Sequence, residues 1–121
     1  QLLNNAGILS DVNQFKRDIY AREKLSSTGF EMGVAIPHAK SNAVKEPRVA
    51  IGISKQGIDF DNEDGNLTNL IFMIATTDSD KGNTHLNALA KLSAKLVHPD
   101  YIEKILNTKT ADELVSFLNN E

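Results

Sequence analysis

The sequence contains no cysteine and no tryptophan, and proline accounts for only three of its 121 residues. Without cysteine the chain cannot form a disulfide, use a thiolate as a nucleophile or bind zinc through thiolate ligands. This composition suits a protein of the reducing cytoplasm, and a cytoplasmic location is therefore our expectation.

Long apolar runs and basic clusters are also missing. No segment approaches the roughly 20 apolar residues that a helix needs to cross a bilayer. The 13 lysine and arginine residues are outnumbered by 16 acidic residues, which gives a net charge of −3, and they form no block that would attract nucleic acid. We expect neither direct insertion into a membrane nor nucleic-acid binding.

The length and the apolar pattern predict one domain in which helices and strands interleave. Ser10 is a potential N-cap, and Thr110–Glu113 has the pattern of a capping box. Helices are predicted over 11–22, 85–97, 100–106 and after 110, strands over 34–36, 48–54 and 67–75, and polar loops over 39–47, 56–66 and 76–83. The last strand is the most apolar, which predicts a central position covered on both faces. The fold class is therefore α/β, with one sheet covered by helices.

The segment 33–40 contains the strongest candidate for a reactive side chain. Residues 34–36 form a short apolar run that is typical of a buried strand, and Pro37 ends this run because it lacks an N–H donor. His38 is therefore predicted at a strand end or loop start rather than inside the sheet. Such a position suits a reactive group.

A histidine in this position can carry a phosphoryl group. The reference pKa of imidazole is about 6.5, so near neutral pH one ring nitrogen is free to attack phosphorus. The product carries about two negative charges and needs positive or donor groups nearby. Arg22 and the N-terminus of the predicted helix that bears His85 can supply them without a metal.

Each of these residues also has an ordinary structural interpretation. A histidine after a proline is usually a loop residue, an arginine near a helix end is usually solvated or salt-bridged, and we interpret His98 as structural or on the surface. The acidic residues Asp59, Asp61, Glu63 and Asp64 lack the spacing of a calcium loop, and three histidines without supporting carboxylates make a poor zinc site. We therefore predict no metal site and no cofactor.

Three groups of residues match a known family in their order and approximate spacing. They are Arg22-Glu23 with Ser27-Thr28-Gly29, the run from Gly33 to His38, and His85-Leu86 with Leu89-Ala90 and Leu92-Ser93. From about Gly7 to Leu118 the sequence resembles the enzyme IIA domain of the fructose and mannitol class of the bacterial phosphoenolpyruvate-dependent sugar phosphotransferase system. The resemblance implies a single mixed β-sheet flanked by helices.

The resemblance also implies a phosphotransferase component that works through a phosphohistidine. His38 would accept the phosphoryl group from the carrier HPr and pass it to a cysteine of an enzyme IIB domain. His38 matches the phosphorylated histidine, His85 the second active-site histidine, and Arg22 and Thr28 the phosphate-binding positions. Leu86 is predicted to belong to an apolar rim that docks a partner.

The first residues of the chain look like the end of a helix that stops at Gly7. We expect residues 1–121 to form one enzyme IIA-like domain, with its N-terminal strand and most of its first helix preceding Gln1. Both a free-standing protein and a fusion to a membrane IIC transporter agree with the resemblance.

Three functions remain open at this point. The stretches 43–47, 67–75 and 83–86 resemble the fructose branch of the family more than the nitrogen-regulatory branch, which favours sugar uptake. A regulatory module would carry the same phosphohistidine but change its binding to a transporter, kinase or transcription regulator. A histidine phosphohydrolase is disfavoured because no carboxylate is placed by the sequence as a general acid.

Overall fold

The computed structural model describes residues 1–29, 31–60, 62, 64–79 and 84–119. The chain divides into two compact units, Gln1–Asn87 and Ala88–Glu121. Helix α3 (Thr84–Leu96) begins in the first unit and continues into the second. The prediction that 1–121 forms one domain stays a prediction.

Helices and strands interleave in the first unit, as predicted for an α/β protein. Its elements are α1 (Leu2–Asn5), α2 (Val12–Leu25), a 3₁₀ turn (Glu31–Gly33), β1 (Val34–Ala35), β2 (His38–Ser41), β3 (Arg48–Ile58), β4 (Thr68–Thr77) and the start of α3. Helix α1 ends before Gly7, which has a positive φ of 77°, as the terminal glycine of a helix often does. The predicted helix end at Gly7 is confirmed.

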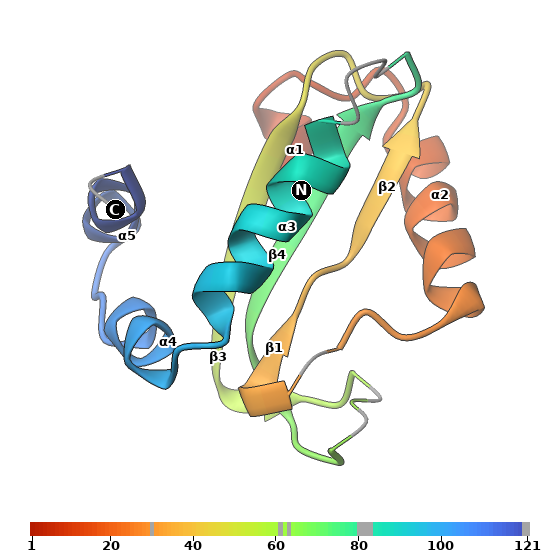
Figure 1. Cartoon of the computed structure of the whole chain (residues 1–121). Helices are drawn as coiled ribbons and strands as arrows, with labels where there is room; N and C mark the ends of the chain where they lie inside the picture. The colour runs from red at the N-terminus through yellow and green to blue at the C-terminus, as the bar shows by residue number, and fades with distance from the viewer. Residues whose placement is uncertain (30, 61, 63, 80–83, 120–121) are drawn as a thin grey trace. The chain divides into compact units, whose positions relative to one another are not determined.

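Strand β4 is the centre of a four-stranded mixed sheet (Figure 1). Strand β3 pairs with it antiparallel, from Arg48 opposite Ala75 to Ile58 opposite Thr68, whereas β1 and β2 both pair with it parallel. The part of β4 that pairs with β3 overlaps the part that pairs with β1 and β2. Strands β1 and β2 must therefore lie along one edge of β4, and β3 along the opposite edge. The predicted central strand and mixed sheet are confirmed.

Strands β1 and β2 are two halves of one interrupted strand. Val34 lies opposite Leu70 and His38 lies opposite Ile74, so the same register applies on both sides of Pro37. The carbonyl of Pro37 still accepts a hydrogen bond from the Ile74 amide at 2.9 Å. Proline therefore removes one donor from this strand but leaves its path along β4 unchanged.

Helix α2 lies beside β2 (Figure 1), and an apolar cluster holds it on the sheet. Phe15 and Ile19 of α2 are buried there with Ala39 of β2 and Ala75 of β4. The other buried members of the cluster are Leu3, Ile8, Leu9, Ala43 and Val44. Full burial of one large apolar side chain contributes about 1.5–3 kcal/mol, so this cluster fixes α2 against β2.

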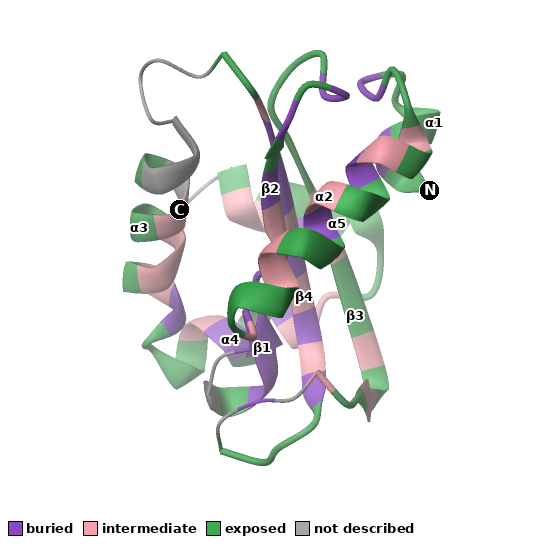
Figure 2. Ribbon diagram, turned by 90° about the vertical axis from the view of Figure 1, so that its right-hand side faces the viewer, coloured by how far each residue is buried: buried purple, intermediate pink, exposed green. Residues whose placement is uncertain are grey.

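Burial alternates along the first part of β4 (Figure 2). Thr68, Leu70 and Phe72 are buried, whereas Asn69 and the other intervening residues are only half-buried. The second face is therefore only partly covered along this part of the strand, where Asn69 donates a side-chain hydrogen bond to the Ser54 carbonyl at 2.8 Å. Continuous burial is limited to 74–76.

The cap of α2 differs from the prediction. Asp11, not Ser10, is the N-cap, and its carboxylate accepts hydrogen bonds from the amides of Asn13 and Gln14, each at 3.1 Å. Ser10 is engaged elsewhere, because its amide donates to the carbonyl of Ala43 at 2.7 Å and its hydroxyl donates to the same oxygen at 3.3 Å. Tertiary pairing thus decides between two good capping residues.

Two predicted loops are shorter than expected. Strand β2 takes up the first part of the predicted loop 39–47, and β3 continues to Ile58, which is only the third residue of the predicted loop 56–66. The long strand β4 provides partners for both extensions. The register of β3 shifts between Ile53 and Ile58, close to Gly57, whose φ is +86°.

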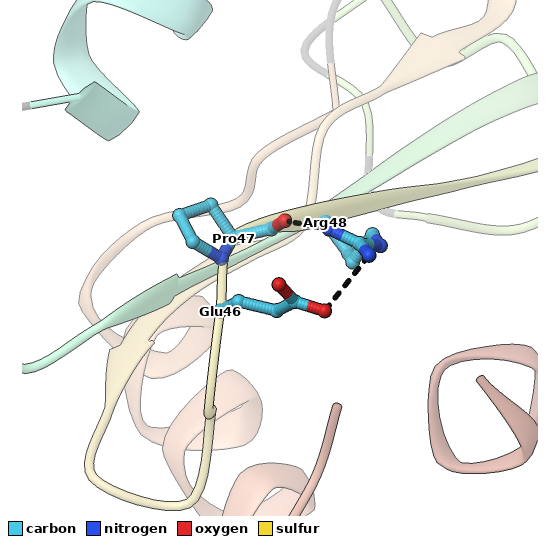
Figure 3. Close-up of polar contacts among 3 residues, drawn as sticks. All are labelled: Glu46, Pro47 and Arg48. Atoms are coloured by element: carbon cyan, nitrogen blue, oxygen red, sulfur yellow. Dashed lines mark hydrogen bonds and ion pairs between the residues drawn. The ribbon is translucent and has the colours of Figure 1, made fainter. Parts of the chain in front are cut away.

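An exposed ion pair lies where the chain enters β3 (Figure 3). Nη2 of Arg48 is 2.8 Å from Oε1 of Glu46, and Nη1 donates to the carbonyl of Pro47 at 3.0 Å. The two charged side chains are 49% and 55% exposed. Pairs with such exposure contribute at most about 1 kcal/mol, so this one adds little to stability.

The second unit contains the rest of α3, α4 (Pro99–Leu106) and α5 (Ala111–Asn119). Pro99 is the first residue of α4, where a missing N–H costs nothing. The predicted capping box of α5 is confirmed, because the amide of Glu113 donates to Oγ1 of Thr110 at 3.1 Å. The Glu113 carboxylate in turn accepts from the amide of Lys109 at 3.0 Å.

We expect Asp11→Ala to lower the free energy of unfolding by about 1 kcal/mol, because two helix N–H groups lose their acceptor. Ser10→Ala is the matched control and should change it by less than about 0.5 kcal/mol, since its hydroxyl bond is long and partly exposed. Urea unfolding followed by circular dichroism measures both values. A larger loss for Ser10→Ala would contradict the assignment of the cap.

Candidate functional site

His38 is the first residue of β2. It lies at a strand end, as predicted, but the chain continues along β4 to Ser41 and does not enter the loop that we expected. The prediction that His38 lies outside the sheet was therefore wrong, because the register persists across Pro37 and His38 pairs with Ile74. The side chain is half-buried.

The backbone assigns the tautomer of the His38 ring. Nδ1 lies 2.9 Å from the carbonyl oxygen of Ile36. A carbonyl oxygen can only accept a hydrogen bond, so Nδ1 carries the proton and donates it. In the neutral ring the lone pair then resides on Nε2, which makes Nε2 the nucleophilic nitrogen.

Thr28 lies beside the strand that leads to His38. Its carbonyl accepts a hydrogen bond from the Ile36 amide at 2.9 Å, and Gly29 forms an antiparallel bridge with Ala35. Its hydroxyl donates to Oε1 of Glu23, and its amide donates to Oε2 of the same carboxylate at 3.2 Å. The hydroxyl proton of this predicted phosphate-binding residue is thus directed to Glu23.

Arg22 lies in the last turn of α2 and is half-buried. Its Nη1 donates to the carbonyl of Ser26 at 2.9 Å. A guanidinium has five N–H donors, so several are left to bind an anion. Among the hydrogen bonds of the described residues, none joins Arg22 or Thr28 directly to His38.

The other predicted site residues lie on α3. The helix begins at Thr84, which places His85 and Leu86 in its first turn, as predicted. The side chains of these residues, and the segment 80–83 before them, lie outside the described residues. Their roles as second active-site histidine and docking residue remain predictions.

Glu23 and Asn62 contact the predicted site but received no role from the sequence. Glu23 had a signal, since it follows Arg22 within the matched motif. Asn62 had none, because it belongs to a polar turn. Its side-chain amide donates to the carbonyl of Asn66 at 3.0 Å and to Oγ1 of Thr68 at 2.9 Å.

The structure explains why a glycine follows Thr28. A Cβ atom at Gly29 would lie 1.8 Å from Oδ1 of Asn62, which is itself buried. The φ angle of Gly29 is not in the left-handed region, so the constraint is space rather than conformation. The amide of Gly29 also donates to Oγ of Ser27 at 3.1 Å, which closes the turn.

Asp64 belongs to the turn that follows Asn62, in which the amide of Gly65 donates to the carbonyl of Asn62 at 3.0 Å. Its carboxylate accepts hydrogen bonds from the amides of Asn66 and Met32, and the bond from Asn66 is the main reason why the pKa of Asp64 lies below its ordinary value. Within the described part of the chain, no three His, Cys, Asp or Glu side chains are grouped to hold a metal ion. No described helix is long and apolar enough to cross a membrane.

We expect Gly29→Ala to lower the free energy of unfolding by about 1–3 kcal/mol, because Asn62 must move and loses hydrogen bonds. Gly52→Ala in β3 is the control, since a Cβ there meets nothing within 4 Å. It should leave stability unchanged or raise it slightly. Equal destabilisation by the two variants in urea unfolding would show that Asn62 does not impose the glycine.

All 121 residues match the family model described as "Phosphoenolpyruvate-dependent sugar phosphotransferase system, EIIA 2". The chain is 41% identical over 118 residues to the PTS system fructose-specific EIIABC component of Bacillus subtilis, which covers 98% of this chain and 18% of that protein. It is 39% identical over 106 residues to the PTS system fructose-specific EIIA component of Haloferax volcanii, which covers 88% of this chain and 68% of that protein.

The fold is also similar to a solved structure, the nitrogen regulatory protein IIA-Ntr of Neisseria meningitidis. The TM-score is 0.78 at 34% sequence identity, over 84% of this chain and 69% of that one. This likeness confirms the predicted fold class. The chain spans only about a fifth of the length of the Bacillus relative, 18% of it.

Proposed function

The chain belongs to the EIIA 2 family of the phosphoenolpyruvate-dependent sugar phosphotransferase system, which confirms the resemblance, and from this premise we propose that His38 is its phosphoryl carrier. The observation that carries the proposal is the hydrogen bond from Nδ1 of His38 to the Ile36 carbonyl. It holds the proton on one nitrogen and leaves Nε2 as a nucleophile.

Two transfers follow from this chemistry. Nε2 attacks the phosphorus of the phosphohistidine on HPr, so a new N–P bond forms as the donor N–P bond breaks. The thiolate of an enzyme IIB cysteine then attacks the same phosphorus, and the bond to Nε2 breaks as the S–P bond forms. Each step moves one phosphoryl group in line and depends on positioning and electrostatics.

The charge of the bound phosphoryl group is balanced by cationic and donor groups. Nη1 of Arg22 donates to the Ser26 carbonyl, and the other N–H groups of the guanidinium can donate to the phosphoryl oxygens. The first turn of α3, with His85, supplies the positive end of a helix dipole. Thr28 can take part only if its hydroxyl leaves Glu23.

The partners and pathway are proposed from the relatives. The fructose-specific names of the Bacillus and Haloferax proteins favour a role in fructose-type sugar uptake. We place the domain in the cytoplasm, where the absence of cysteine led us to expect it. The name EIIABC of the first relative supports an enzyme IIB partner and fusion or association with a membrane IIC transporter.

A second candidate function is regulation, favoured by the likeness to the nitrogen regulatory protein of Neisseria meningitidis. In that case His38 carries the phosphoryl group but does not pass it on. Incubating the phosphorylated chain with an enzyme IIB domain of the fructose type separates the two functions. Transfer of the phosphoryl group from His38 to the IIB cysteine supports transport. Retention of the phosphoryl group on His38, together with altered binding to another protein, supports regulation.

We expect His38→Ala to abolish phosphorylation by phosphoenolpyruvate, enzyme I and HPr without unfolding the chain. Intact-mass analysis and peptide mapping at alkaline pH measure the modification, and NMR of the phosphorylated ring should place the group on Nε2. His98→Ala is the control, since His98 is exposed at the start of α4, and it should keep the wild-type rate. An alanine variant at 38 that is still phosphorylated would refute the assignment.

Leu86 is proposed to dock the partner. Leu86→Asp should slow phosphorylation by phospho-HPr by roughly tenfold or more, because a charge enters an apolar contact. Ala94→Asp, at an exposed position roughly two turns farther along the same helix, should slow it by less than about twofold. If Leu86→Asp reduces thermal stability in proportion to activity, the residue belongs to the core and the docking role is wrong.

A further inference from the structure

A series of hydrogen bonds connects the carboxylate of Glu23 to the ring of His38. Glu23 accepts from the amide and hydroxyl of Thr28, and the Thr28 carbonyl accepts from the Ile36 amide at 2.9 Å. The Ile36 carbonyl then accepts from Nδ1 of His38, also at 2.9 Å. Thr28 and Ile36 are buried, with 5% and 1% of their surface exposed, so most of the series is shielded from water.

Ile36 is where this series reaches the reactive ring. In a β-strand the N–H and C=O groups of one residue point to the same side. The N–H of Ile36 points away from β4 to Thr28, so its carbonyl also lies on that side. The position of the Thr28 backbone therefore determines where the carbonyl that holds the His38 ring is directed.

We propose that Glu23 is a positioning residue for the nucleophilic nitrogen of His38. By holding both the amide and the hydroxyl of Thr28, its carboxylate fixes the pairing of Thr28 with Ile36. That pairing directs the carbonyl that keeps the proton on Nδ1 and the lone pair on Nε2. The inference rests on the proposed function of His38 as phosphoryl carrier.

The same helix provides a matched control. Asp18 of α2 accepts a hydrogen bond from the hydroxyl of Ser41, at the far end of β2. This link also joins a carboxylate of α2 to a hydroxyl at the sheet, but no hydrogen bond of the described residues leads from it to the His38 ring. Loss of Asp18 should loosen α2 as much as loss of Glu23 without disturbing the ring.

The experiment compares three variants of the 121-residue chain: Glu23→Ala, Glu23→Gln and Asp18→Ala. The ¹⁵N chemical shifts of His38 report the tautomer at about pH 8.5, where imidazole is neutral. The rate of phosphorylation by phospho-HPr reports the reaction, and urea unfolding reports stability. Glutamine is the conservative variant, since its oxygen can accept from the Thr28 amide while its NH₂ group donates to the Thr28 hydroxyl.

We expect Glu23→Ala to slow phosphorylation by roughly tenfold and to mix the two tautomers, because the ring loses its fixed acceptor. Glu23→Gln and Asp18→Ala should both keep the Nδ1–H tautomer and a rate within about twofold of the wild type. An unchanged tautomer and rate in Glu23→Ala would overturn the proposal. An equal loss of rate in Glu23→Gln would also overturn it, because the negative charge of Glu23 would then be the cause of the slower reaction. An equal loss of rate in Asp18→Ala would overturn it too, because general loosening of α2 would then be the cause.

If Glu23→Ala does not fold, Thr28→Val decides, because it removes the hydroxyl and nearly preserves the shape. A shifted tautomer ratio in that variant supports the proposal, and an unchanged ratio overturns it. The tautomer measurement needs no phosphoryl donor. A wild-type chain that phospho-HPr does not label would therefore refute the proposed function, while the ring shifts would still decide the role of Glu23.

Discussion

The unbroken register across Pro37 is the constraint on which the site depends. A slip of one residue would turn His38 to the other face of the sheet, because side chains alternate with a period of two. The pairing of β1 and β2 with β4 at one common offset shows that no slip occurs. With both halves held by β4, the outward groups of Ile36 are free to bond Thr28 and the imidazole.

Much of the fold could be predicted because local patterns and tertiary contacts agree. The most apolar run became the central strand, and amphipathic spacing located the helices. Strand β2 could not be predicted, since Ala, Lys and Ser at 39–41 have no strong strand preference and are extended because β4 offers partners. Ser10 and Asp11 are both good caps, and the choice is made by Ala43, 33 residues along the chain from Ser10.

The sequence named candidate residues for the site but did not give their contacts. The histidine that follows the apolar run and Pro37, together with the motif spacing, made His38, Arg22 and Thr28 the candidates. Spacing does not say which donor meets which acceptor, and the Thr28 hydroxyl is bonded to Glu23 rather than left open. The bonds between Thr28 and Glu23 form because the chain turns after α2 and then runs beside β1, where Gly29 bridges Ala35. The local sequence does not predict the path of this turn.

The bond between His38 and Ile36 involves Nδ1, which is not the ring nitrogen that we propose to react. On the proposed chemistry, a phosphoryl group added at Nε2 leaves the Nδ1–H group and its carbonyl acceptor in place. The empty and loaded forms can therefore share one backbone and one ring orientation. On this proposal, little free energy would go into reshaping the carrier. The donor and the acceptor on either side would then set the direction of phosphoryl transfer, and the domain could carry the group in either direction.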